Sequence, residues 1–161
     1  MDCCAPDDPT AECARAPCPG CGRVGRPVGA VTVEAILRPG CAAGLRDAGP
    51  RFCRTQDCGV LYYGSEGRSA HKQDAIVRVG LKESCDPLPV CYCFGFSRAD
   101  IERELAESGG CTIAARITAE VRAGNCACEI KNPAGVCCLG DVNREIKEAK
   151  LRQVPAARTG T

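Results

Sequence analysis

Cysteine makes up 16 of the 161 residues, about one in ten, and this density limits how the chain can be stabilised. Bulky side chains are scarce by comparison: the sequence holds three tyrosines, three phenylalanines and no tryptophan. A large continuous apolar core is therefore not expected. Cysteine at this level predicts either a framework of disulfides or a set of metal sites.

The beginning of the sequence favours metal sites. Residues 1–8 are acidic and hold no apolar stretch, so we expect no secretory signal peptide and a cytoplasmic protein. Thiols stay reduced in that compartment and are free to bind metals. No apolar run approaches the ~20 residues of a membrane helix, and we expect no membrane insertion. Lysine and arginine number 21 against 20 acidic residues, which argues against a nucleic-acid partner.

The pattern of turns and apolar residues predicts an α+β fold held together by metals. We expect a zinc-ribbon-like β unit followed by a small helical unit that binds an iron–sulfur cluster. The predicted segments are a flexible, acidic, cysteine-containing arm, the zinc unit, the helical unit and a disordered tail, at 1–17, 18–85, 86–150 and 151–161. In the zinc unit we expect strands at 28–33, 60–63 and 75–81, and a short helix at 32–37 that ends before Pro39 and Gly40.

Three helices are expected in the second unit. Ser97 and Asp100 form a capping-box-like start for the first, which ends at the glycines 109–110. The next runs from about 112 to 123. The last runs from about 139 to 150, with Val142 and Ile146 inward and its charged residues, Glu145 among them, largely outward. Each helix offers few apolar residues, so we expect bound metal to supply much of the stability.

Four cysteines have the arrangement of a zinc ribbon. Cys18 and Cys21 form a CxxC knuckle, and Cys53 and Cys58 follow at CxxxxC spacing just before a predicted strand. Four thiolates favour tetrahedral zinc, and a closed four-ligand site is typically structural. Asp57 is a possible oxygen ligand if one of the cysteines is not used.

Nothing in the sequence indicates hydrolysis or group transfer. The single histidine, His71, stands in a polar stretch and is expected in a solvated loop. A zinc ion with four protein ligands has no open position for a substrate. We therefore name no catalytic residue, and redox activity is the only enzymatic activity considered.

A second group of cysteines has a different spacing. Cys91 and Cys93 form a CxC pair, which suits two sulfurs on one cluster iron better than a zinc knuckle. Cys128 and the adjacent Cys137 and Cys138 follow, each near the start of a predicted helix. The amino end of a helix offers free N–H groups to an anionic group. Four cysteine ligands arranged two and two are typical of a [2Fe–2S] cluster.

These motifs resemble a known family. The sequences 89-PVCYCFG-95, Cys128 with the NPxGxCC run at 132–138, and the upstream FCxxxxC block at 52–58 are similar to the N-terminal module of CopZ-type copper chaperones. The helical half is also similar to bacterioferritin-associated ferredoxin domains. The resemblance covers about residues 18–150. It implies a mononuclear zinc site and a [2Fe–2S] cluster in one protein, with a role in copper handling and in reduction of Cu(II) to Cu(I).

The resemblance also implies ligands and partners. It assigns zinc to the four cysteines of the first group and the cluster to Cys91, Cys93, Cys128 and Cys138, with Cys137 as the alternate. A copper-exporting ATPase or another metal-handling protein is the implied partner, together with an unknown electron donor. The sequence contains no GMxCxxC copper-binding loop of the kind that a full CopZ-type chaperone carries.

The remaining cysteines have weaker signals. Cys3, Cys4 and Cys13 are a possible site for Cu(I) or another soft metal, because soft thiolates select Cu(I). Cys111 is expected to pack as a small apolar residue. Cys85 and Cys126 lie near the predicted cluster in sequence, and Cys41 has no assigned role.

Three functions fit the sequence. The leading hypothesis is a metal-handling electron-transfer protein that reduces Cu(II), with copper as cargo or substrate. The second is a non-redox module in which every thiol site holds zinc and the fold recognises a partner. The third is a ferredoxin-like donor to an enzyme unrelated to copper.

Overall fold

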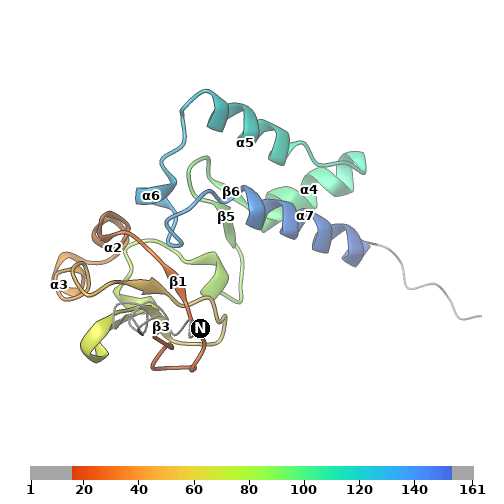
Figure 1. The fold of residues 1–161 in the computed structure, drawn as a ribbon. Helices are drawn as coiled ribbons and strands as arrows, with labels where there is room; N and C mark the ends of the chain where they lie inside the picture. Colours follow the sequence, from red (N-terminus) through yellow and green to blue (C-terminus); the bar gives the residue numbers. More distant parts are fainter. Residues whose placement is uncertain (1–15, 154–161) are drawn as a thin grey trace, which may run out of the picture.

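A computed structural model of the protein describes residues 16–153, and the predicted soft-metal cysteines Cys3, Cys4 and Cys13 lie outside this range. The chain folds into a β-rich unit and a helical unit that contact each other along one side (Figure 1). The architecture is α+β, as predicted. None of the described helices is both long and apolar enough to cross a membrane.

The β-rich unit is built on a small antiparallel sheet. Its strands lie in the order β1-β2-β3-β4. Their bounds are β1 Arg26–Pro27, β2 Arg51–Phe52, β3 Val60–Tyr63 and β4 Ser69–His71. Strand β3 was predicted and all four of its residues are buried, because Leu61 and Tyr62 pack into the apolar core while Val60 and Tyr63 pack beside a group of cysteines.

Helices and turns surround the sheet. The helices are α2 Ala30–Ile36 and α3 Pro39–Ala42, and the 3₁₀ turns are η1 Ser65–Gly67, η2 Lys72–Asp74 and η3 Gly80–Lys82. The strand predicted at 28–33 is wrong, and the short helix predicted at 32–37 is close to the observed α2. Val33 and Ile36 are fully buried three residues apart, a helical spacing that outweighs the strand preference of the β-branched residues.

The strand predicted at 75–81 is also absent. This segment makes one isolated bridge, between Ala75 and Leu37, and then turns into η3. Val77, Val79 and Leu81 do face the core of the β-rich unit, while Ile76 on the opposite side is 63% exposed. Alternating valines therefore gave a strand-like pattern without a partner strand to pair with.

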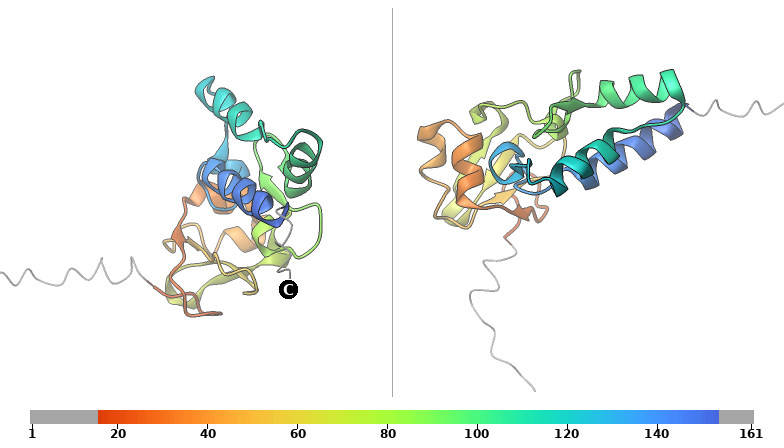
Figure 2. Two further views of the ribbon diagram at one scale, coloured as in Figure 1. Left: turned by 90° about the vertical axis from the view of Figure 1, so that its right-hand side faces the viewer. Right: turned by 90° about the horizontal axis from the view of Figure 1, so that it is seen from above.

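The helical unit begins with a short hairpin and continues into four helices. The hairpin strands are β5 Pro89–Cys91 and β6 Phe96–Ser97. The helices are α4 Arg98–Ser108, α5 Ile113–Arg122, α6 Cys128–Lys131 and α7 Leu139–Gln153. The three predicted helices are confirmed as α4, α5 and α7, and α7 continues three residues beyond its predicted end. Figure 2 shows α4 and α5 lying alongside α7.

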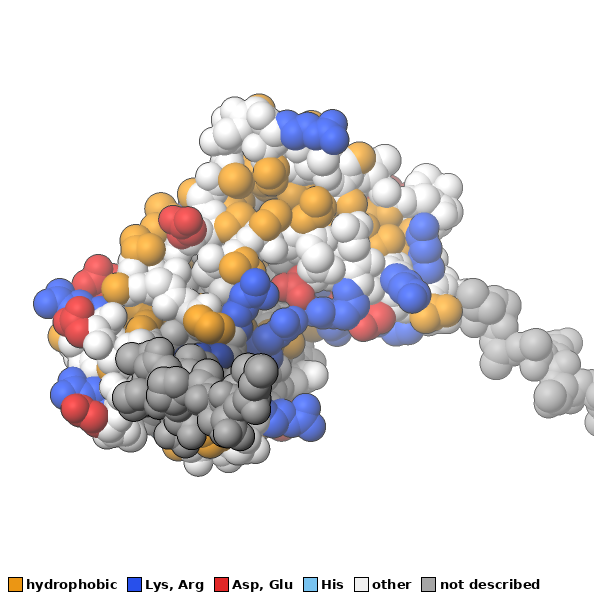
Figure 3. Space-filling view, viewed as in Figure 1, with side chains coloured by type: hydrophobic (Ala, Val, Ile, Leu, Met, Phe, Trp, Pro, Cys, Tyr) orange, Lys and Arg blue, Asp and Glu red, His pale blue; other side chains and the backbone are white. Residues whose placement is uncertain are grey.

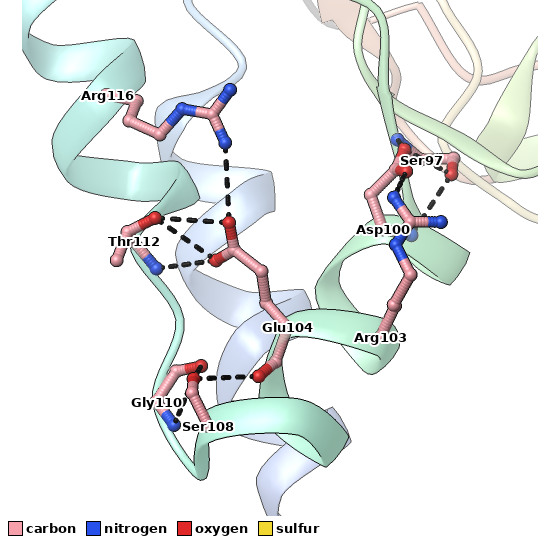
Figure 4. A network of polar contacts seen from close by, with 8 residues as sticks. All are labelled: Ser97, Asp100, Arg103, Glu104, Ser108, Gly110, Thr112 and Arg116. Atoms are coloured by element: carbon pink, nitrogen blue, oxygen red, sulfur yellow. Dashed lines mark hydrogen bonds and ion pairs between the residues drawn. The ribbon is translucent and has the colours of Figure 1, made fainter.

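Polar contacts fix the corner between α4 and α5 (Figure 4). At the start of α4, Ser97 and Asp100 form the predicted capping box. Glu104 lies within α4, and its carboxylate accepts a hydrogen bond from the Thr112 N–H at 2.7 Å and pairs with Arg116 at 3.3 Å. One carboxylate thus joins α4 to the first turns of α5.

Glu145 on α7 differs from its prediction. It was expected to face solvent, but it is buried and its carboxylate pairs with Arg98 and Arg152, each at 2.7 Å. The sequence pattern could not reveal this, because Arg98 comes from the start of α4, on a neighbouring helix. Two arginines allow a carboxylate to lie against the helical core.

The two units share buried contacts. Helix α2 packs against α6. The Tyr62 hydroxyl, from the sheet, donates to the carbonyl of Pro133 at 2.6 Å, and the Gly80 N–H donates to the hydroxyl of Tyr92 at 2.9 Å. Pro133 lies in the loop before Cys137 and Cys138, and Tyr92 lies between Cys91 and Cys93. The β-rich unit therefore contacts both cysteine-bearing loops of the helical unit.

Candidate metal centres

The first group of cysteines converges at one edge of the sheet. Cys18 and Cys21 lie in the loop before β1, Cys53 directly follows β2, and Cys58 precedes β3. The four sulfurs all lie within 4.8 Å of one another. The Cys18 and Cys58 sulfurs are 3.8 Å apart, and those of Cys21 and Cys53 are 3.7 Å apart.

These distances fit a tetrahedral zinc site. A Zn–S bond of about 2.3 Å places two sulfurs of a tetrahedron about 3.8 Å apart. The donor set is also the one that structural zinc sites use, four cysteine thiolates. The residues predicted from CxxC and CxxxxC spacing can therefore hold one zinc ion in a closed site.

Local backbone structure explains how the knuckle reaches the metal position. The Cys18 N–H donates to the carbonyl of Arg23 at 2.9 Å, and the Gly22 N–H donates to the carbonyl of Cys18 at 2.8 Å. A side chain at Gly20 would lie 2.9 Å from the Cys58 sulfur. Glycine at this position therefore lets the two halves of the site approach each other.

The thiols of this group differ in their acidity. The hydroxyl of Thr55, 3.2 Å from the Cys21 sulfur, and the backbone N–H of Arg23 lower the pKa of Cys21 to about 6. Burial raises the pKa of Cys18 to about 12 and also raises the pKa of Cys58. Cys21 therefore ionises more easily than Cys18 or Cys58, whose buried thiolates need a cation to stabilise them.

Three further residues near the zinc group are Asp57, His71 and Tyr63. Asp57 is exposed and is not part of the sulfur group, so the structure offers it no ligand role. His71 is exposed as predicted, although it ends β4 and is not in a loop. Tyr63 was not predicted: its hydroxyl accepts from the Gly25 N–H and donates to the carbonyl of Ala16. No local motif marks this role, because the partners lie far away in sequence.

The second group of cysteines forms two close pairs. The sulfurs of Cys91 and Cys138 are 2.9 Å apart, and those of Cys93 and Cys128 are 3.4 Å apart. The CxC motif was expected to place both of its sulfurs together, but Cys93 is paired with Cys128, the first residue of α6, and Cys91 with Cys138, in the loop after α6. Cys138 is buried beside Cys91, while Cys137 is exposed.

Backbone N–H groups surround this second group. The Ala127 N–H donates to the Cys93 sulfur at 3.3 Å. The contact with Cys138 and backbone N–H groups of Phe94 and Cys93 lower the pKa of Cys91 to about 6, against the effect of burial. The same sulfur contact, together with burial, raises the pKa of Cys138.

The remaining described cysteines lie apart from these pairs. Cys111 is half-buried and packs against the helical core, in agreement with its predicted role. Cys41 is half-buried against the core of the β-rich unit. Cys85 and Cys126 are exposed, and the guanidinium of Arg78 lies 3.4 Å from the Cys85 sulfur.

Comparison with known proteins agrees with this geometry. Residues 15–76 match the CopZ-type zinc binding domain. This segment contains all four cysteines of the first group and ends before the second. The zinc assignment therefore has support from sulfur geometry and from the domain match.

The similarity extends beyond the zinc domain. The chain is 33% identical over 127 residues to the copper chaperone CopZ of Archaeoglobus fulgidus, which covers 79% of this chain and 60% of that protein. The chain thus corresponds to less than two thirds of that relative's length. The X-ray structure of the N-terminal domain of the same CopZ superposes with a TM-score of 0.64 at 27% identity, covering 80% of this chain and 95% of that domain.

Proposed function

We propose that this protein is a cytoplasmic copper-handling electron-transfer module in which zinc is structural and Cys91, Cys93, Cys128 and Cys138 hold a [2Fe–2S] cluster. Such a cluster supplies a one-electron couple close to the protein surface. Cu(II) is the proposed electron acceptor and leaves as Cu(I). The similarity to a copper chaperone supports copper as the metal that is handled.

The arrangement of the second group in two pairs carries this proposal. A single ion requires all of its sulfur ligands to lie close together. Among the described residues, this holds for the zinc group, whose four sulfurs all lie within 4.8 Å of one another. The second group is instead divided into the pairs Cys91–Cys138 and Cys93–Cys128. A binuclear cluster with two cysteines on each iron suits two pairs better than one zinc ion does.

The surrounding residues suit an anionic cluster. The N–H of Ala127 points at the Cys93 sulfur, and N–H groups of Cys93 and Phe94 stabilise the thiolate of Cys91. Hydrogen bonds to cluster sulfurs favour the reduced, more negative state and raise the reduction potential. The half-buried Cys93 and exposed Cys137 place this site near solvent, where a metal ion can approach.

The electron balance is simple. One Cu(II) takes up one electron and becomes one Cu(I), and a cellular one-electron donor protein restores the electron to the module. No proton is consumed, because the thiolate ligands stay bound to iron. A copper-exporting ATPase or another metal-handling protein is the proposed recipient of Cu(I).

The test uses the anaerobic full chain, reduced with dithionite and freed of excess reductant. Addition of Cu(II) with a Cu(I)-specific chromophoric chelator is expected to give one Cu(I) for each cluster reoxidised. Cys128→Ser is expected to lose both the visible absorption of the cluster and the reaction, while its zinc content stays the same. A reduced wild-type cluster that Cu(II) does not reoxidise would contradict the copper role and favour a donor for another enzyme.

A further inference from the structure

Lys82 is a buried lysine that contacts the loop between two zinc-binding cysteines. Its side chain belongs to η3, and the residue is 6% exposed. Its ammonium donates to the carbonyl oxygens of Thr55 at 2.5 Å and Cys58 at 3.0 Å. Lys82 lies beyond residues 15–76, the segment that matches the zinc binding domain.

The two carbonyls belong to the turn that presents Cys58 to the metal. The N–H of Cys58 donates to the carbonyl of Thr55 at 3.2 Å and closes this turn. The Thr55 hydroxyl lies 3.2 Å from the sulfur of Cys21, a ligand from the other half of the site. By binding both carbonyls, Lys82 holds a turn that contributes to two of the four thiols.

Lys82 has no carboxylate partner among residues 16–153. None of the ion pairs among residues 16–153 includes Lys82, although nearby Lys72 pairs with Glu83 at 3.1 Å. A buried ammonium is costly when only neutral groups surround it. Four thiolates around Zn²⁺ leave two net negative charges at the site. This negative charge can balance the ammonium of Lys82, which pairs with no carboxylate among residues 16–153.

We propose that Lys82 is a positioning residue of the zinc site: its ammonium holds the Thr55–Cys58 turn and compensates the negative charge of the zinc tetrathiolate. The residue acts through the carbonyls of the ligand loop and does not bind the metal. Residues that support metal ligands in this way typically change metal affinity by about 10- to 100-fold when they are replaced.

The experiment compares zinc affinities by competition with a chromophoric chelator, under anaerobic conditions, in the full chain. Lys82→Met keeps the buried aliphatic stem without charge, and Lys82→Gln keeps an N–H donor without charge. Both are expected to bind zinc about 10- to 100-fold more weakly than wild type. Lys82→Arg keeps the charge and is expected to recover at least part of the loss.

Lys72→Met is the matched control. The ammonium of Lys72 donates to the carbonyl of Lys82 at 3.2 Å, but its side chain is 46% exposed and has a carboxylate partner. The zinc affinity of the Lys72→Met variant is expected to stay within twofold of wild type. Circular dichroism monitors folding of each variant, so that Lys82→Gln carries the test if Lys82→Met does not fold.

Two results would overturn the proposal. Wild-type zinc affinity in Lys82→Met would show that the lysine has no role at the site. Wild-type affinity in Lys82→Gln, or an equal loss in Lys82→Arg and Lys82→Met, would show that the positive charge is not what supports the metal.

Discussion

At the scale of single residues, burial of charge is the least expected property of this protein. Glu145 and Lys82 are both charged and both buried, yet Glu145 was expected to face solvent and no sequence pattern marks Lys82 for burial. Their partners explain this difference. Glu145 has Arg98 and Arg152, whereas Lys82 has backbone carbonyls beside the zinc thiols. Such partnerships depend on tertiary contacts, so local sequence cannot reveal them.

Replacement of Glu145 by alanine is expected to destabilise the helical unit. The variant leaves Arg98 and Arg152 without their shared carboxylate. Since both arginines are partly exposed, we expect a loss of about 1–2 kcal/mol in the free energy of unfolding. Urea denaturation followed by circular dichroism measures it. Glu148→Ala, an exposed position one turn along α7, is the control and should change stability by less than about 0.5 kcal/mol.

At the scale of elements, the helices were predictable because their signals are local. Ser97 caps α4, apolar residues recur at Ile113 and Ile117 in α5, and Gly109 adopts a left-handed conformation after α4. The segments 28–33 and 75–81 were misassigned because β-branched residues favour strands only when a partner strand is present. The CxxC and CxxxxC spacings predicted the four cysteines whose sulfurs converge in the structure. They could not give the cross-pairing of Cys91 with Cys138, since that depends on how strand β5 packs against α7.

Ser97→Ala tests the cap of α4. The Ser97 hydroxyl accepts from the Asp100 N–H at 3.3 Å, and Asp100 accepts from the Ser97 N–H at 2.8 Å. Loss of the hydroxyl is expected to lower the free energy of unfolding by about 1 kcal/mol, as measured by urea denaturation. Ser108→Ala, at the exposed end of the same helix, should cost much less.

The same cap predicts a dependence on pH. Hydrogen bonds from Ser97 lower the pKa of the Asp100 carboxyl. The stability that the ionised Asp100 carboxylate gives to the folded protein is therefore fully present above the ordinary pKa of about 4. It disappears as the pH falls through the lowered pKa of Asp100 in the folded state. Ser97→Ala should reduce this acid-dependent loss of stability, and an unchanged pH profile would contradict the role assigned to the cap.

Gly135→Ala tests the loop that leads to Cys138. Gly135 has a φ of +65°, and an added side chain would lie 2.9 Å from the Thr32 hydroxyl on α2. We expect a loss of at least about 1–2 kcal/mol in the free energy of unfolding, together with weaker retention of iron. Gly124→Ala is the matched control, because Gly124 also has a positive φ but open space around it. Equal effects of the two changes would show that contact with α2 is unimportant.

At the scale of the whole molecule, the two cysteine groups come from separate parts of the sequence but are joined in structure. The zinc thiols come from residues 18–58 and the second group from residues 91–138. Tyr62 and Gly80 of the β-rich unit nevertheless hold the loops that carry the second group. Each group should thus bind its own metal, while the stability of one depends on the other.

Cys18→Ser tests this relation between the units. The variant is expected to lose zinc and to retain most of the cluster absorption at low temperature, because none of the proposed cluster ligands is changed. Its cluster should bleach at a lower temperature than in wild type, since the supporting sheet has lost its metal. Thermal bleaching identical to wild type would show that the two units are independent.

Metal content tests the central claim most directly. Protein purified without oxygen is analysed for iron, zinc and acid-labile sulfide, and its visible spectrum is recorded before and after dithionite. The account predicts about two irons, two sulfides and one zinc per chain, with visible bands that fade on reduction. A colourless protein that holds only zinc, even after cluster reconstitution, would contradict the electron-transfer function.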